Sequence, residues 1–258
     1  MYIDSTGMWT EYWHGELTKN AMSELVKNGL YDGATRKRNK INKGIGDYHA
    51  TIIAEGNMAT DSGAKSAVFS QGRHLNRNTV GDSREDWGEK LLAQAIDAWK
   101  TAENIYDYYV RFFCADNNEP AILAMHEERK NALRLLGEGL HSIQDIDAHL
   151  NVGLDTPLYV VKYHQTMDED ISLGEAYRRE KVSKFDNPFY DITETKIPIV
   201  NTVQGYTYTV YQYEHVAIRV PVGEGYSKRY TDSLDRSMKY LKRFYSAVDT
   251  AQKMFVEF

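Results

Sequence analysis

The chain has 258 residues, a formal net charge of −6 and a hydrophobic fraction of 42%. This length is enough for one large domain with its own core, and the mild acidity excludes a broad polybasic surface for nucleic acid. Cys114 is the only cysteine, which excludes disulfides within the chain and thiolate metal clusters. Any metal ion would therefore be held by imidazole and carboxylate groups, which suit zinc and related divalent ions.

Apolar residues recur at helical spacing over most of the chain. Pro120 is well placed to open a long helix. The basic stretch 34–44 and the Gly-, Asn- and Ser-rich stretch 55–84 are predicted to be mainly linker and loop. Helices are expected at about residues 14–30, 48–54, 83–113, 120–150, 157–163, 173–184 and 227–258.

The periodicity changes in residues 195–222, where β-branched and aromatic residues alternate with polar ones. This pattern predicts two or three antiparallel strands with a turn near Gln204-Gly205. The predicted fold class is therefore mainly α, with a small antiparallel β insertion before the last helix. Four tyrosines of this insertion favour a half-buried hairpin, although they could also line a substrate surface: Tyr206, Tyr208, Tyr211 and Tyr213. No run of residues is as apolar as a membrane-spanning helix, and none resembles a signal peptide.

His141, Asp145 and His149 follow one another at four-residue intervals in a predicted helix. Each such step turns about 40° past a full circle and climbs about 6 Å, so the three side chains share one face. Leu136 and Leu140 indicate that this helix is largely buried. Imidazole and carboxylate groups in a buried row are costly unless something pairs them, which favours a metal site over a row of satisfied polar residues.

Other candidate ligands lie outside this helix. His164 and Asp168 have the same four-residue spacing, which would aim both at one ion if the segment is helical or leave them as a solvated pair. Asp61 and His74 flank a segment with no helical pattern, and such a loop pair can close around a metal ion. His14 opens the first helix as either a ligand or a surface or capping residue. The remaining histidines lack suitable partners in sequence and are interpreted as surface or packing residues: His49, His126 and His215.

The run LGEGLHSIQDIDAHLNV around His141 resembles the central helix of the bacterial zinc-dependent phospholipase C family of the alpha-toxin type. The fungal single-strand nucleases share the helical fold of that family. The segments HGELTKNAM around His14 and GRHLNR around His74 add to the similarity, whose motifs cover about residues 9–170. The resemblance implies a helical bundle with up to three zinc ions, and the β insertion has no counterpart in it.

The resemblance also implies three ligand sets. The first zinc would be held by Asp61, His74, His141 and Asp145; the second by His149, His164 and Asp168; and the third by His14, the bridging Asp145 and an N-terminal tryptophan, Trp9. His149 follows Asp145 more closely than is usual in the family. Asp168 replaces the usual glutamate, so Glu169 and Asp170 remain alternative ligands.

The segment YIDSTGM at residues 2–8 is similar to the self-cleavage motif that ends the core of rearrangement-hotspot (Rhs) toxins. Cleavage after Met8 would make Trp9 a new N-terminus; alternatively, residues 1–8 have no role and Trp9 only packs. We therefore expect residues 1–8 to be a remnant of that motif and residues 9–258 to be one catalytic domain with the β insertion at about 195–222. In this context the chain would leave an Rhs shell, be secreted or delivered into a target cell by a specialised system, and have a cognate immunity protein.

The predicted activity is phosphodiester hydrolysis, for which clustered zinc ions are suited. Asp61 is the candidate to orient or deprotonate the attacking water. A phospholipase C acting on the phospholipid membrane surface, releasing diacylglycerol and a phosphorylated head group, is the leading hypothesis. The alternatives are a zinc-dependent nuclease on the same metal core and a non-catalytic binding module stabilised by zinc.

Overall fold

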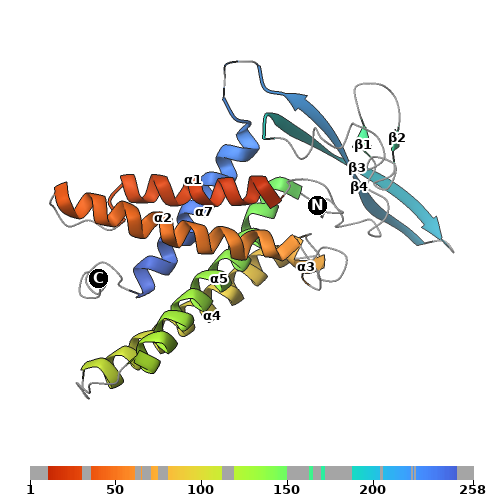
Figure 1. Cartoon of the computed structure of the whole chain (residues 1–258). Helices are drawn as coiled ribbons and strands as arrows, with labels where there is room; N and C mark the ends of the chain where they lie inside the picture. Colours follow the sequence, from red (N-terminus) through yellow and green to blue (C-terminus); the bar gives the residue numbers. More distant parts are fainter. Residues whose placement is uncertain are drawn as a thin grey trace.

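The fold was analysed in a computed structural model of the whole chain (Figure 1). The structure describes residues 11–30, 36–61, 65, 71–74, 81–111, 119–149, 163–164, 170–171, 188–203, 206–221, 223 and 225–248.

Five long helices form the body of the molecule, and the longest of them, α5, contacts the other four (Figure 1). Among the described residues, three short helical segments join them: the 3-10 turn η1 at Ala59–Asp61, α3 at Gln71–His74 and the π-helical η3 at Tyr106–Arg111. No helix among the described residues is long and apolar enough to cross a membrane. The long helices are α1 (Glu11–Lys27), α2 (Arg36–Met58), α4 (Ser83–Ile105), α5 (Glu119–His149) and α7 (Lys228–Val248).

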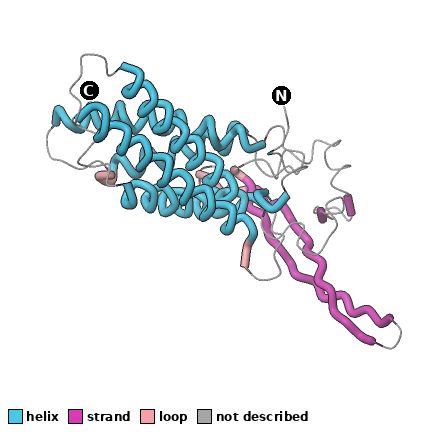
Figure 2. The backbone as a smooth tube through the Cα atoms, turned by 90° about the horizontal axis from the view of Figure 1, so that it is seen from below, coloured by secondary structure: helices cyan, strands magenta, loops and turns pink. Residues whose placement is uncertain are grey.

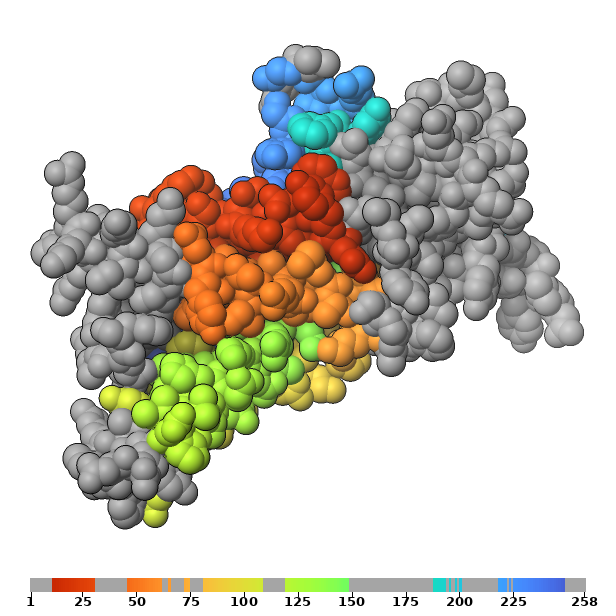
Figure 3. Space-filling model, in the orientation of Figure 1, coloured from red at the N-terminus to blue at the C-terminus, as the bar shows by residue number. Residues whose placement is uncertain are grey.

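The core lies where α5 meets its neighbours. Leu133, Leu136 and Leu140 follow one stripe of α5 and are all buried, because three- and four-residue steps return to the same helix face. Trp99 of α4 and Phe244 of α7 pack into the same core and contact each other edge to face. In the space-filling view, α1, α2 and α5 lie as adjacent bands on one side of the molecule (Figure 3).

A long two-stranded ribbon projects from one end of the helices (Figure 2). Strand β3 (Tyr190–Val203) pairs antiparallel with β4 (Tyr206–Arg219) in unbroken register, from Tyr190 opposite Arg219 to Val203 opposite Tyr206. Two-residue strands β1 (Tyr163–His164) and β2 (Asp170–Ile171) extend the sheet in the order β2-β1-β4-β3, and β1 runs parallel to β4.

The predicted fold class is confirmed: the chain is mainly helical, and an antiparallel strand pair, β3 and β4, precedes the last helix. The predicted helix at 120–150 agrees with α5 within one residue at each end. The strand pair is longer than expected, and its predicted turn at 204–205 lies outside the described residues. Three further predicted parts also lie outside the described residues: residues 1–8, the helix at 173–184 and residues 249–258 of the last helix.

Three predicted elements are corrected by the structure. The stretch 55–84, predicted to be mainly loop, contains the end of α2, the turn η1 and the short helix α3, because packing against the core extends α2 to Met58. The stretch 34–44 is not a linker from Arg36 onward, because α2 runs from Arg36 to Met58. Lys and Arg are good helix formers, so the basic residues extend a helix whose apolar half is anchored in the core. The helix predicted at 157–163 does not include Tyr163, since that residue pairs with β4; tertiary strand pairing overrides the local pattern there, and residues 157–162 lie outside the described residues.

Candidate metal centre

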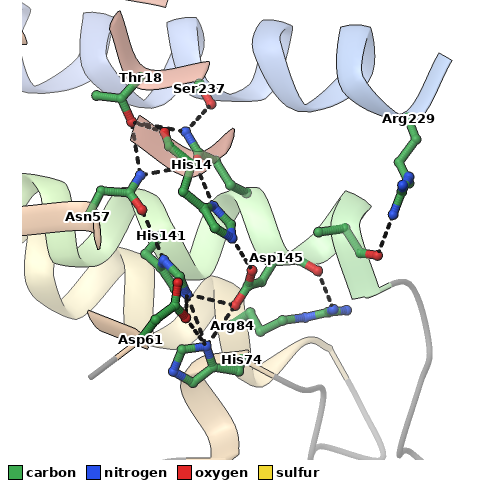
Figure 4. Close-up of polar contacts among 12 residues, drawn as sticks. His14, Thr18, Asn57, Asp61, His74, Arg84, His141, Asp145, Arg229 and Ser237 are labelled. Atoms are coloured by element: carbon green, nitrogen blue, oxygen red, sulfur yellow. Dashed lines mark hydrogen bonds and ion pairs between the residues drawn. The ribbon is translucent and has the colours of Figure 1, made fainter. Parts of the chain in front are cut away.

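Five ionisable side chains from four elements point toward one another (Figure 4). They are His14 of α1, Asp61 of η1, His74 of α3, and His141 and Asp145 of α5. Asp61 is 6% exposed and the other four are fully buried. Groups of this kind are seldom buried without a partner of opposite charge.

Local structure brings each residue to the centre. His141 and Asp145 are one helical turn apart on α5, so their side chains emerge on the same face. His14 shares the inner face of α1 with Leu17 and Thr18, which are also buried. Asp61 and His74 end the short elements η1 and α3, and both side chains turn inward (Figure 4).

Asp145 contacts all three imidazoles of the cluster. Its Oδ1 lies 3.3 Å from His14 Nε2, and its Oδ2 lies 3.0 Å from His74 Nδ1 and 3.1 Å from His141 Nε2. Asp61 Oδ1 lies 3.1 Å from His141 Nε2 and 3.7 Å from His74 Nδ1. Two overlapping triads result, one of His14, Asp61 and His141 and one of His74, His141 and Asp145, each with its donor atoms within 4.8 Å of one another. Each triad could hold a metal ion.

Two buried amides contact the outer nitrogens of two of these imidazoles. His14 Nδ1 lies 2.8 Å from the side-chain oxygen of Gln144, and His141 Nδ1 lies 2.9 Å from that of Asn57. An amide oxygen only accepts, so each Nδ1 carries a proton and donates it. In the neutral ring, Nε2 then presents its lone pair to the carboxylates.

His74 has the opposite orientation. Its Nε2 donates to the main-chain carbonyl of Lys65 at 2.9 Å, which leaves Nδ1 facing the carboxylates. The Lys65 side chain in turn forms an ion pair with Glu138, one turn before His141 on α5, and Arg73 contacts the same carboxylate at 3.4 Å. Lys65 is thus tied to the central helix.

The two carboxylates of the cluster favour the positively charged form of its histidines. Although burial opposes it, the carboxylates of Asp145 and Asp61 raise the pKa of His141 well above its ordinary value. Burial likewise opposes protonation of His74, but its hydrogen bond to Asp145 raises its pKa. Burial alone would raise the pKa of Asp61, and the neighbouring imidazoles of His141, His14 and His74 hold it below the usual range.

The donor set fits a divalent cation. Both carboxylate oxygens of Asp61 are shielded from solvent and form no hydrogen bond of regular geometry among the described residues. When the imidazoles are neutral their lone pairs face two carboxylates, and a cation bound between them would take the place of the protons that the raised pKa values of His141 and His74 favour. Nitrogen and carboxylate donors without a thiolate are typical of zinc and related ions.

The remaining predicted ligands are not placed in this cluster. Trp9 and Asp168 lie outside the described residues. His149 is the last residue of α5, and His164 lies on strand β1; the side chains of both are outside the described part. Because His164 is in a strand, the helical turn predicted to align it with Asp168 is not found there.

Residues that the sequence reasoning missed surround the five. Arg84 is buried, pairs with Asp82 and donates to the main-chain oxygen of Asp145 at 2.8 Å, close to the carboxyl end of α5. Glu11 has a raised pKa, caused by burial and by the nearby Asp61 carboxylate. Its position three residues before His14, on the same helix face, was the available signal.

Comparisons of this chain with family models, curated proteins and solved structures found no match. The resemblance to zinc phospholipases C and single-strand nucleases stays a prediction from the motifs quoted above.

Proposed function

We propose that this protein is a metal-dependent phosphodiesterase whose centre is formed by the five converging side chains: His14, Asp61, His74, His141 and Asp145. The observation that carries the proposal is the position of Asp145, whose two oxygens lie within 3.3 Å of three buried imidazoles. A carboxylate shared in this way suits more than one cation, and zinc is the ion that the donor set favours.

Each residue has a part in this chemistry. Bound zinc ions would supply a water of lowered pKa and offset the negative charge that develops on the phosphate. Asp61 would orient that water and accept its proton, because its Oδ1 faces His141 and His74 in the centre while its Oδ2 has no hydrogen-bond partner among the described residues. Glu11, near Asp61 and less buried, is a second carboxyl group able to exchange protons with solvent.

A phospholipid is the substrate that we propose first. Tyr12 is 60% exposed and packs edge to face on Trp13, the residue before His14. Trp13 contacts Phe189, which stacks on Tyr226, and both of these rings are 42% exposed. This row of aromatic rings gives the chain an exposed apolar surface that begins on α1 at the residues before His14, which supports access from a lipid surface. Cleavage would release diacylglycerol and a phosphorylated head group.

A single-stranded nucleic acid is the second candidate. Phe189 and Tyr226 stack with an interplanar angle of 19°, and Lys228, an exposed residue that pairs with Asp232, follows two residues later in the sequence. Aromatic faces near a cation are the usual platform for unpaired bases.

The decisive experiment assays the purified chain on phosphatidylcholine vesicles and on single-stranded DNA, each with zinc and with a chelator. We expect zinc-dependent release of the phosphorylated head group and no cleavage of DNA. Asp145→Asn should lower the rate more than about 100-fold, a loss beyond that of residues that only support ligands. Asp147→Asn is the matched control, since Asp147 lies on the same helix but binds Arg236 of α7 at 3.0 Å.

Other results would redirect the assignment. Cleavage of DNA alone would favour the nuclease. Zinc binding without cleavage of either substrate would contradict the phosphodiesterase and favour a binding module stabilised by zinc.

A further inference from the structure

Four buried polar residues form a hydrogen-bonded network behind the imidazoles of His14 and His141 (Figure 4). Each comes from a different helix, and all are fully shielded from solvent. Apolar side chains would fill these positions without the cost of burying polar groups, so the network calls for an explanation beyond packing. The four are Thr18 of α1, Asn57 of α2, Gln144 of α5 and Ser237 of α7.

Thr18 fixes the direction of every hydrogen bond in the network. Its hydroxyl donates its one proton to the main-chain oxygen of His14 at 2.9 Å. It can therefore only accept from Asn57 Nδ2 at 2.9 Å and from Gln144 Nε2 at 3.3 Å. Both side-chain amides must present their NH2 groups to Thr18 and their oxygens elsewhere.

The other hydrogen bonds of the network have the same donor and acceptor directions. The second proton of Asn57 Nδ2 goes to Gln144 Oε1 at 3.0 Å, and the second proton of Gln144 Nε2 goes to Ser237 Oγ at 3.2 Å. All four amide protons are thus used. The two amide oxygens are left to accept from His141 Nδ1 and His14 Nδ1.

We infer that Thr18, Asn57 and Gln144 are positioning residues that determine which nitrogen of His14 and His141 binds the metal. Both rings coordinate through Nε2, whereas His74, whose Nε2 donates to Lys65, coordinates through Nδ1. The inference rests on the metal-binding part of the proposed function. It goes beyond it by assigning the coordinating atom of each ring and the residues that select it.

Nitrogen-15 NMR of the zinc-loaded protein, labelled at histidine, reads the assignment directly. We expect His14 and His141 to show zinc on Nε2 and a slowly exchanging proton on Nδ1, with the reverse pattern for His74. Zinc on Nδ1 of either His14 or His141 would overturn the inference.

Variants at position 18 test the network itself. Thr18→Val removes the hydroxyl with little change in shape, and Thr18→Ser restores it. We expect Thr18→Val to weaken zinc binding about tenfold and Thr18→Ser to stay within about twofold of the wild type, as for other residues that support metal ligands. Ser142→Ala is the matched control, because Ser142 is equally buried beside His141 on α5 but its Oγ forms no hydrogen bond among the described residues.

Zinc affinity of Thr18→Val equal to that of the wild type would contradict the inference. If Thr18→Val does not fold by circular dichroism, Gln144→Met replaces it, since this change removes the oxygen that accepts from His14 and Asn57 and the NH2 group that donates to Thr18 and Ser237. Zinc bound with the expected nitrogens but without hydrolysis would refute the proposed activity and leave the inference standing. Hydrolysis by a protein in which His14 or His141 binds zinc through Nδ1 would support the proposed activity and refute the inference.

Discussion

Two buried histidines differ in the sign of the charge around them. His141 lies between the Asp61 and Asp145 carboxylates, which raise its pKa well above the ordinary value. His49 of α2 packs against Trp99 of α4, with Nδ1 2.9 Å from the hydroxyl of Tyr245 of α7. Burial, and to a lesser extent the charge of Arg129, lower its pKa to about 3. His141 therefore belongs to a site for cations, whereas His49 is a packing residue, as its sequence context predicted.

The lowered pKa of His49 predicts a specific loss of stability in acid. Between the pKa of about 3 in the folded chain and the ordinary 6.5, the unfolded chain binds the extra proton. As the pH is lowered through this window, the free energy of unfolding therefore decreases, by up to about 1.4 kcal/mol per pH unit. His49→Gln removes this dependence, so the stability difference between wild type and variant should shrink by about 2 kcal/mol from pH 6.5 to 5.

Urea unfolding at several pH values, with chelator present, measures this difference. The chelator keeps metal binding from adding its own pH dependence. If the free energies of unfolding of the two proteins changed equally with pH, His49 would not titrate as described.

At the scale of helices, the crossing of α2 and α5 sets the geometry of the centre. A Cβ atom on Gly137 would lie 2.1 Å from the main-chain oxygen of Ile53 and 2.8 Å from the main-chain nitrogen of Asn57. One on Gly56 would lie 2.4 Å from the main-chain oxygen of Arg134. Only glycine allows the two backbones to approach this closely, and the approach places Asn57 against His141, one turn after Gly137.

Gly137→Ala should therefore weaken both the fold and the centre. Alanine normally stabilises a helix by about 1 kcal/mol relative to glycine. Here we expect a net loss of about 2 kcal/mol, since the added methyl group meets backbone that cannot move without separating the helices. Zinc affinity should fall as well, because Asn57 is displaced from His141.

Gly15→Ala is the control for this substitution. Its Cβ would meet only the flexible side chain of Met58, at 2.8 Å, so the stability change should stay within about 1 kcal/mol. Denaturant unfolding and zinc titration of both variants provide the measurements. Equal effects of the two substitutions would show that the crossing tolerates a methyl group.

Local sequence patterns explain which parts of the structure were predictable. Pro120 and the spacing of leucines were enough to place α5, and with it the shared face of His141 and Asp145. Asn57 was assigned to a loop, because nothing in the neighbouring residues shows that α2 continues to Met58. Its role depends on a contact between helices that are far apart in sequence, and the same holds for Gln144, which meets His14 across 130 residues. Such pairings come from helix packing and leave no local pattern.

At the scale of the whole molecule, the centre joins most of the helical body. Its five side chains come from α1, η1, α3 and α5, and the network behind them adds α2 and α7. A ligand that binds only when these elements are assembled stabilises the folded state by mass action. Metal binding should therefore be visible as thermal stability of the entire bundle.

Zinc should raise the melting temperature, and a chelator should reverse the change. At a free zinc concentration of about 100 times the dissociation constant the stabilisation is about 2.7 kcal/mol, or roughly 5–10 °C for a chain of this size. Magnesium should have little effect, because it prefers oxygen donors and three of the five donors are imidazoles. Asp145→Asn should abolish the shift, since it removes the charge shared by all three imidazoles, and Asp147→Asn should retain it. Calorimetric scans at increasing zinc concentration test this, and an equal shift in both variants would mean that the ion binds elsewhere.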